Sequence, residues 1–422
     1  MTTRNLPLIG DVGILALVYH EWGPVWMTPH HVLTRLARYF HVVWSEPPHD
    51  WRNFRRSFNR QHVLDVNSEL SIPPGFHVYV PEPWLPKFCR PSWLEGFAFE
   101  RRLKRAIRRL MREGCRKLVL YVWHPQFEPA LSYRDFDLKI YHVDDEYSFS
   151  PNPPPTDPRE LRVLKNVDQV FVVSPSLLER KGTINPHTAF MPEGVDYQLY
   201  ATPTAEPEDL APIPRPRIGY TGNLKLQLDW PLLRELAMRH PQWQFVFVGP
   251  TMKGHGIKGY ISEMSQLKNV HFLGPKSVTA LASYPQHFDV CIMPYRVDGY
   301  TNNIYPLKLH EFLASGRPAV SSTIRSLWDF SNVIALVDGP GDWSQAIAGA
   351  LQAPATCRAS IAGRQKIARD HDWGNLIDSL AFTICERLGP EFSAEFAELG
   401  HSTSVVNDVH APLSPDFARS MG

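Results

Sequence analysis

Short, continuous apolar runs recur along this chain, and most are followed by a segment whose apolar residues have helical spacing. Strands with such continuous runs belong to parallel sheets, because helices cover both faces of these sheets. The alternation therefore predicts βαβ units and an α/β protein with doubly wound parallel sheets. In the first half of the chain, strands are predicted at residues 12–18, 41–47, 77–80, 118–122, 138–143 and 169–173.

The same rhythm restarts after a stretch rich in proline and acidic residues that ends at Pro216. A chain of 422 residues is long enough for two domains. We therefore expect two Rossmann-like domains that face each other across a cleft. The predicted parts are a first domain over residues 1–197, a linker over 198–216, a second domain over 217–372, a helix over 373–390 that packs back toward the first domain, and a disordered tail over 391–422.

Composition excludes several classes of protein. A net charge of +1 argues against a nucleic-acid-binding protein, which would carry a basic domain. The chain contains no run of 18 apolar residues and no basic start followed by an apolar stretch, so we expect a cytoplasmic protein without a signal peptide or membrane span. The cysteines are odd in number and scattered, which favours buried thiols in a reducing compartment: Cys89, Cys115, Cys291, Cys357 and Cys385.

The most informative local pattern covers residues 289–323, DVCIMPYRVDGYTNNIYPLKLHEFLASGRPAVSST. A buried strand at 290–293 is followed by a polar loop, and residues 301–303 are of the types that cap helices. We expect a helix over 304–315 with Pro306 in its first turn. The free N–H groups of such a helix face the carboxyl end of the strand and attract anions.

Two charged side chains extend this predicted anion site. Lys308 adds a full positive charge, and Glu311, one turn deeper, can accept hydrogen bonds from two hydroxyl groups. Together they favour a nucleotide diphosphate that is attached to a ribose. The alternative is an ordinary amphipathic helix with an i,i+3 Lys/Glu pair, which stabilises a helix by only a few tenths of a kcal/mol.

From Pro306 to Val320 the chain matches the pattern P-x-K-x-x-E-[FY]-L-A-x-G-[KR]-P-[AV]-V and resembles the nucleotide-sugar site of glycosyltransferase family 4. Asn303 replaces a second glutamate that many members carry. The segments MPEGVDYQLY and VDQVFVVSPSLLERK are similar to two further motifs of this family. YHVDDEYSFS and TPHHVLTRLARYFHVVWSEPP resemble a bacterial subgroup that acts on cell-envelope or capsular polysaccharide.

The resemblance covers roughly residues 12–385 and implies a GT-B fold, with the acceptor in the first domain and the donor in the second. It implies transfer of a sugar from a nucleotide diphosphate sugar to a saccharide or lipid-linked saccharide. It further implies retention of anomeric configuration, with no required metal and no cofactor. The alternatives are a nucleotide-sugar 2-epimerase of the same fold and a non-catalytic sugar-nucleotide-binding subunit.

The candidate donor-binding residues follow strand ends of the second domain or belong to the segment just described. Gly222 allows close backbone approach, and Lys225 is a candidate phosphate contact whose alternative is a solvated surface lysine. Lys276 lies where the family reads the base through main-chain groups. The full set is Gly222, Asn223, Lys225, Gly249, Lys276, Asn303, Ile304, Tyr305, Lys308 and Glu311.

The candidate catalytic residues follow strands of the first domain. Asp144 and Asp145 come directly after the strand at 138–143, and one of them is expected to act as a general base or to orient a sugar hydroxyl. Asp144 aligns with a histidine that related enzymes keep near the anomeric carbon. The alternative is a turn cap or an ion pair with an arginine. His20 and His124 also follow strand ends.

Residues 97–117 form a basic stretch with apolar residues at helical spacing. Arg101, Arg105, Arg108 and Arg112 are expected to contact an anionic membrane surface, each contributing on the order of 1 kcal/mol. The alternative is a solvated helix that packs its apolar stripe on the sheet. We find no metal-binding motif, because His30-His31 has no further ligands and Asp135-Phe136-Asp137 precedes a strand.

Overall fold

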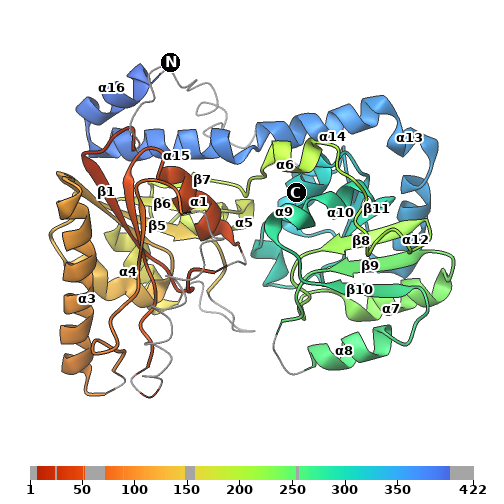
Figure 1. Cartoon of the computed structure of the whole chain (residues 1–422), viewed down its shortest axis with the longest axis horizontal. Coiled ribbons are helices and arrows are strands. Elements are labelled where there is room, and N and C mark those ends of the chain that lie inside the picture. The colour runs from red at the N-terminus through yellow and green to blue at the C-terminus, as the bar shows by residue number, and fades with distance from the viewer. Residues whose placement is uncertain are drawn as a thin grey trace. The chain divides into compact units, whose positions relative to one another are not determined.

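The computed structural model describes residues 7–23, 26–50, 52, 72–88, 90–147, 157–252 and 256–399. The chain divides into two compact units (Figure 1). The first unit comprises Met1–Val173, Leu177–Met191 and Gly374–Gly422, and the second comprises Ser174–Ser176 and Pro192–Trp373. Each unit contains its own parallel sheet, which confirms the predicted fold class.

The first unit is built on a seven-stranded sheet with the order β3-β2-β1-β4-β5-β6-β7, and its paired strands are all parallel. The strands are β1 (Val12–Leu17), β2 (His41–Ser45), β3 (Phe76–Tyr79), β4 (Lys117–Val122), β5 (Leu138–Val143), β6 (Gln169–Val172) and β7 (Thr188–Phe190). Every residue of β1 is buried, as its continuous apolar sequence requires.

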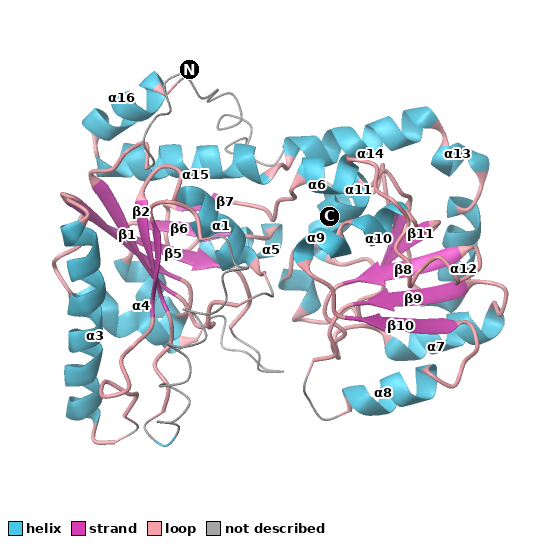
Figure 2. Cartoon of the chain, viewed as in Figure 1, coloured by secondary structure: helices cyan, strands magenta, loops and turns pink. Residues whose placement is uncertain are grey.

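Helices cover both faces of this sheet (Figure 2). On one face Trp44 of β2 contacts His30, with ring centroids 4.6 Å apart. On the other face a methyl group at Gly13 would lie 3.1 Å from Cβ of Leu110. The helices of this unit are α1 (Thr28–Leu36), α3 (Ser92–Arg112), the 3-10 segment η2 (Pro125–Ser132), α4 (Pro158–Asn166), α5 (Pro175–Lys181), α15 (Trp373–Leu388) and α16 (Pro390–Glu398).

The second unit is built on a six-stranded parallel sheet with the order β10-β9-β8-β11-β12-β13. Its strands are β8 (Arg217–Thr221), β9 (Gln244–Val248), β10 (Val270–Gly274), β11 (Val290–Met293), β12 (Ala319–Ser321) and β13 (Ala335–Leu336). Its helices are α6 (Tyr197–Ala201), α7 (Trp230–Arg239), α8 (Ile257–Met264), α9 (Val278–Leu281), α10 (Ser283–Gln286), η3 (Thr301–Asn303), α11 (Lys308–Ala314), η4 (Arg325–Phe330), α12 (Gly339–Ala350), α13 (Ala353–Thr356) and α14 (Arg358–Asp370).

The expected helix over 304–315 is shorter than the sequence predicted, because α11 begins only at Lys308. The polar side chains of the preceding loop hydrogen-bond the loop itself. The Asp298 N–H donates to Oγ1 of Thr301 at 2.9 Å, and Nδ2 of Asn303 donates to the Gly299 carbonyl at 2.7 Å. The prediction that residues 301–303 cap the helix was therefore wrong, and Pro306 lies before the helix.

The prediction of a disordered tail from residue 391 was wrong for its first part. Helix α16 spans Pro390–Glu398 and buries Phe392 and Phe396. The Phe396 ring lies 5.3 Å from that of Tyr39, so the helix joins the core of the first unit. Residues 400–422 lie outside the described residues. The expected linker also contains structure, since α6 and the buried Leu210 belong to the second unit.

The cysteine prediction was correct for three residues and wrong for one. Cys115, Cys291 and Cys385 are buried thiols, whereas Cys357 precedes α14 and is exposed. Cys89 lies outside the described residues. Across the described parts of the chain, no helix combines the length and the apolar composition that crossing a membrane requires.

Candidate functional site

Each sheet has one point where the order of its strands reverses. In the first unit this switch point lies between β1 and β4, and in the second it lies between β8 and β11. Ligands of doubly wound sheets bind beyond the carboxyl ends of the strands at such points, where neighbouring loops part in opposite directions. The candidate catalytic residues follow β1, β4 and β5, and several donor-site candidates follow β8, β9 and β10.

At the first switch point two tyrosines hold Asp144. The Tyr147 hydroxyl lies 2.7 Å from Oδ1 of Asp144, and the Tyr19 hydroxyl lies 3.3 Å from Oδ2. Tyr147 is also 3.1 Å from the carbonyl of Trp123 at the end of β4. The carboxyl group of Asp144 is thus fixed from both sides by phenol groups that come from two different loops.

The surroundings of Asp144 disfavour its negative charge. Burial raises the pKa of its carboxyl to about 7, and the neighbouring Asp145 acts in the same direction, although the hydrogen bonds from Tyr147 and Tyr19 oppose the shift. A carboxyl group with this pKa is divided between its acid and base forms near neutral pH. Such a group is suited to accept or donate a proton in a reaction.

Two histidines border the same cluster. The ring of His124 lies 5.0 Å from that of Tyr19 and 4.7 Å from that of Tyr147, and the His20 ring lies 3.8 Å from Tyr19. Nδ1 of His124 accepts the Gln126 N–H at 3.1 Å, so the proton of the neutral ring is on Nε2. Burial lowers the pKa of His20 to about 4, which keeps this ring neutral at neutral pH.

Asp145 lies beside Asp144 but is held differently. Its Oδ1 accepts the backbone N–H of Glu146 at 2.8 Å. Glu146 is itself buried, and its two carboxylate oxygens lie 2.6 Å from Nη1 of Arg180 and 3.3 Å from Nζ of Lys181. Lys181 is completely buried and also binds Glu160 at 2.8 Å. The turn that carries both aspartates is therefore anchored to ion pairs inside the first unit.

At the second switch point three glycines end neighbouring strands. Gly222, Gly249 and Gly274 have φ angles of 119°, 147° and 71°, which L side chains rarely adopt. A methyl group at Gly249 would lie only 2.1 Å from the Gly222 carbonyl oxygen. Glycine at 249 therefore lets the backbones after β8 and β9 pack directly on each other.

Lys308 extends to the same place from the start of α11. Its Nζ donates to the Tyr295 hydroxyl at 2.9 Å and lies 5.1 Å from the centre of the Tyr220 ring. A methyl group at Gly222 would lie 3.5 Å from this nitrogen. Burial opposes the charged form, but Tyr220, Tyr295 and Glu311 outweigh it and raise the pKa of Lys308. The ammonium group is therefore held charged beside the end of β8.

Glu311 follows one turn after Lys308 on the same helix. Burial raises the pKa of its carboxyl, whereas Lys308 and a hydrogen bond from Tyr200 lower it in part. Tyr200 belongs to α6 and is buried. A positive group and a carboxyl group thus lie close together at the switch point.

The remaining donor-site candidates have diverse surroundings. The Asn223 carbonyl accepts the Tyr220 hydroxyl at 3.1 Å, and the Lys225 carbonyl accepts Nε1 of Trp230 at 3.0 Å. Both residues therefore belong to a loop held by its backbone. The side chain of Lys276 pairs with Asp209 at 2.7 Å, which leaves its main chain as the candidate contact.

Ile304 and Tyr305 lie between the loop and α11. Both side chains are buried, and the Tyr305 hydroxyl lies 2.8 Å from Nε2 of His310. Their side chains therefore form part of the unit's core beneath α11. Asn303 is buried as well and is held by Gly299, as described above.

The basic stretch forms α3, and its predicted apolar stripe is buried at Leu103, Ile107 and Leu110. Arg101, Arg108 and Arg112 are exposed. Arg105 is only partly exposed, because its guanidinium group forms an ion pair with Glu82. Arg102, which the membrane prediction left out, is buried and binds the Leu85 and Pro86 carbonyls.

Sequence reasoning missed the four tyrosines that hold Asp144 and Lys308 and the buried ions beneath Asp145. Tyr147 could have been found, since it lies three residues after Asp144 in a turn. Tyr19, Tyr220 and Tyr295 come from other loops and strands, so only the fold brings them to their partners. Lys181 gave no signal, because a lysine near the end of a helix is usually solvated.

Solved structures with similar architecture identify the fold. Sucrose-phosphate synthase of Thermosynechococcus elongatus has a TM-score of 0.67 at 17% identity, with 89% of this chain and 98% of that chain covered. HepE of Anabaena, in complex with UDP and glucose, has a TM-score of 0.61 at 16% identity, with 89% and 99% covered. At these identities the likeness shows the fold, which is the GT-B fold of two Rossmann-like domains.

The sequence of the second unit also matches a protein family. Residues 215–353 match the family of glycosyl transferases group 1, so the chain carries a domain of this family, as its motifs predicted. Over 173 residues the chain is 31% identical to a protein of Bacillus subtilis (strain 168) provisionally named teichuronic acid biosynthesis glycosyltransferase TuaH. The match covers 40% of this chain and 43% of that protein, so the chain spans less than half the length of this curated relative.

Proposed function

We propose that the protein is a glycosyltransferase that moves a sugar from a nucleotide diphosphate sugar to a saccharide or lipid-linked saccharide acceptor. The observation that carries this proposal is the charged Lys308, which two tyrosines hold beside Gly222 in a domain of the glycosyl transferases group 1 family. The leaving nucleoside diphosphate gains negative charge as the glycosidic bond breaks. A fixed ammonium group at that place stabilises the transition state more than the ground state.

The donor is assigned to the second unit. Its diphosphate would contact Lys308 and the backbone of Gly222 and Asn223, and its ribose hydroxyls would bind Glu311. Uridine is the first base to test, because HepE binds UDP and UDP-glucose in solved structures. The support for this assignment is the proximity of a positive group, a carboxyl group and a glycine with positive φ.

The acceptor is assigned to the first unit, with Asp144 as the group that accepts a hydrogen bond from a reacting sugar hydroxyl. Its fixed orientation and its pKa of about 7 support this role. We propose retention of anomeric configuration and transfer without a metal ion, as the resemblance to family 4 implies. The name of the Bacillus relative makes a cell-envelope polysaccharide the first acceptor class to test.

The decisive experiment incubates the protein with UDP, GDP and ADP sugars and measures release of the nucleoside diphosphate with and without acceptor. We expect slow hydrolysis of one donor and faster turnover when the acceptor is present, both unchanged by EDTA. The proton NMR coupling of the product's anomeric hydrogen then reports retention or inversion. Tight donor binding without any turnover would contradict the proposal and indicate a binding subunit.

We also propose that α3 brings the protein to an anionic membrane on its cytoplasmic side. Beside the exposed arginines, Trp93 and Phe97 at the start of α3 are 71% and 48% exposed, and Trp84 is 61% exposed. Aromatic rings next to cations are typical of surfaces that bind lipid headgroups. Neither feature is needed for packing α3 on the sheet.

Sedimentation with vesicles tests the membrane proposal. Binding to vesicles with anionic lipid should be strong at low salt, weaker at high salt and absent with neutral vesicles. Glutamate substitutions at four arginines of α3 should abolish it: Arg101, Arg105, Arg108 and Arg112. A matched control changes the same charge at exposed positions of the second unit and should bind normally: Lys258, Lys268, Arg358 and Lys366. If both variants lost vesicle binding equally, binding would depend on the net charge of the protein and not on α3, which would contradict the proposal.

A further inference from the structure

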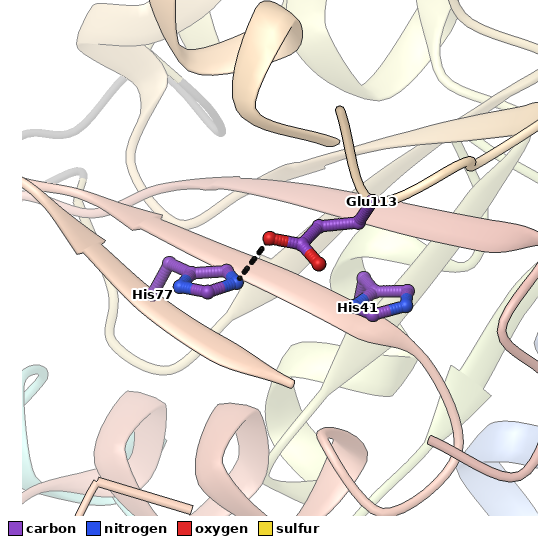
Figure 3. A group of neighbouring side chains, drawn as sticks. All are labelled: His41, His77 and Glu113. Atoms are coloured by element: carbon purple, nitrogen blue, oxygen red, sulfur yellow. Dashed lines mark ion pairs between the residues drawn. The ribbon is translucent and has the colours of Figure 1, made fainter. Parts of the chain in front are cut away.

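Three side chains that no sequence motif connects converge at the amino end of the first sheet (Figure 3). His41 is the first residue of β2, His77 is in β3, and Glu113 directly follows α3. The candidate ligand atoms of these residues all lie within 4.8 Å of one another. The cluster lies at the opposite end of the sheet from Asp144, which follows the carboxyl end of β5.

The fold explains why these residues meet. Val43 and His77 are partners in the parallel register of β2 and β3, so His41, two residues before Val43, lies on the same face as His77. Gly13 is the register partner of His41 on the other side and faces Leu110 of α3. All of these side chains therefore lie under α3, and Glu113 reaches them from the end of that helix.

The distances within the cluster match those of a metal site. Nε2 of His77 and Oε1 of Glu113 are 3.2 Å apart. Two ligand atoms of a tetrahedral zinc ion with bonds of about 2.0–2.1 Å are roughly 3.3 Å apart. His41 is the third member of the cluster, and its Nδ1 is buried and makes no hydrogen bond to any residue that the structure describes. One nitrogen of its ring lies within 4.8 Å of the ligand atoms of His77 and Glu113.

We propose that His41, His77 and Glu113 bind a zinc ion, with water as its fourth ligand. Two imidazole nitrogens and one carboxylate favour zinc over magnesium or calcium, which prefer oxygen ligands. This site goes beyond the proposed transfer reaction and lies apart from its residues.

Arg109 competes with the ion. Its Nη2 lies 3.3 Å from Nδ1 of His77, and because arginine can only donate, this nitrogen accepts and the proton of the neutral ring is on Nε2. Zinc takes the lone pair of Nε2, so the ring must change to the tautomer with its proton on Nδ1. Arg109 then has no acceptor there and must turn away, which its exposed position allows.

A bound ion would join three elements that are far apart in the sequence. It would tie the end of α3 to the starts of β2 and of the edge strand β3. The zinc ion would thereby fix α3 on the sheet. Because α3 carries the arginines of the proposed membrane surface, the ion would also hold that surface in place. Its role is structural, and removing it should leave donor hydrolysis unchanged.

The test is zinc binding by the full chain after treatment with EDTA and dialysis, measured by titration calorimetry. We expect one zinc ion per chain at micromolar or lower Kd, and a rise in Tm of roughly 5–10 °C at a hundredfold excess over Kd. Co²⁺ in place of zinc should give the visible absorption of a four-coordinate site. His77→Ala and Glu113→Ala should each weaken binding at least tenfold, whereas His187→Ala, at an exposed position of the same unit, should not.

Arg109→Ala provides the sharpest result, because removal of the competing guanidinium group should tighten zinc binding severalfold. Zinc held by scattered surface histidines would not respond to this change. If the alanine variants lose their far-UV circular dichroism, His77→Gln and Glu113→Gln replace them. Unchanged affinity in the ligand variants, or a Kd in the millimolar range for the parent protein, would overturn the proposal. Donor hydrolysis measured in the same samples reports the transferase proposal separately.

Discussion

At each switch point two tyrosines surround one ionisable side chain, which is an acid in the first unit and a base in the second. In the first unit two tyrosines hold a carboxyl group, and in the second two tyrosines hold an ammonium group. Burial disfavours the charged form in both. It prevails at Asp144, whose pKa rises to about 7, but at Lys308 the phenol oxygens and Glu311 outweigh it. The same type of side chain therefore surrounds a group that can exchange a proton and a group that keeps its charge.

The different pKa shifts of Asp144 and Lys308 suit two different chemical roles. A group that must take part in proton transfer needs a pKa near the working pH. A group that stabilises a leaving diphosphate must stay charged throughout. The second aspartate, Asp145, shows that position alone does not decide the task, because it is tied to the backbone N–H of Glu146 above a buried ion network.

The largest effect is expected for Asp144→Asn. This variant keeps the shape and the hydrogen bond from Tyr147 but removes the negative charge, so turnover should fall by about 10²–10⁴-fold while donor binding survives. In the parent protein, kcat/KM should rise as the pH passes through about 7 and level off above it, because the ionised form accepts the hydroxyl proton or hydrogen bond. Asp145→Asn is the matched control and should retain most activity. Equal rates in both variants would remove Asp144 from the chemistry.

Lys308→Ala should lower kcat by about 10²–10³-fold, since one fixed donor to a developing charge is lost. Because the diphosphate is most charged in the transition state, KM should change less than kcat. Steady-state kinetics of donor hydrolysis measures both constants. Lys276→Ala is the control, as its ammonium group pairs with Asp209. An effect confined to KM would mean that Lys308 binds the donor without assisting the reaction.

Glu311→Ala should weaken donor binding by roughly 10–150-fold, which corresponds to the loss of one charged hydrogen bond of about 1.5–3 kcal/mol. Titration calorimetry with the nucleotide sugar measures this change, and circular dichroism checks the fold. Glu235→Ala, on the exposed side of α7, is the control for removal of a helical glutamate. Donor affinity equal to that of the parent protein would refute a ribose contact at Glu311.

The smallest expected effect concerns stability. The pKa of Asp144 is about 7 in the folded protein and about 3.9 in an unfolded chain, so the folded state binds more protons between these values. Stability should therefore fall as the pH rises from about 4 to 7. Asp144→Asn should stabilise the protein at pH 8 by about 1–2 kcal/mol, after allowance for the partial exposure of the side chain. Thermal unfolding from pH 4 to 8 checks this, and a gain that is independent of pH would contradict it.

Strands such as β1 and β11 were predictable because they coincide with buried, continuous apolar runs. The expected run at 138–143 is β5 to the residue, and the run at 12–18 exceeds β1 by one residue. The start of α11 was not predictable in the same way, because Thr301 and Asn303 have cap-forming side chains that the fold directs into their own loop. Helix α16 was missed, since its two phenylalanines become informative only when the surface that they cover is known.

The proximity of candidate site residues was predictable where one segment carries them. Lys308 and Glu311 lie on a single helix, so their spacing brought them to the same face. The tyrosine partners and the cluster of His41, His77 and Glu113 are different, because their members come from separate strands and loops. Register and packing bring such residues together, and neither can be read from spacing in one sequence.

The buried ions beneath the Asp144–Asp145 turn give the first unit a particular response to temperature. Hydration of ions becomes less favourable on heating, so the cost of burying Glu146, Glu160 and Lys181 falls, whereas the stabilisation from apolar contacts levels off. As the temperature rises, the ion pairs therefore contribute a larger fraction of the free energy that stabilises this turn, and apolar contacts contribute a smaller one. Heating should loosen the apolar periphery of the unit before it loosens the turn.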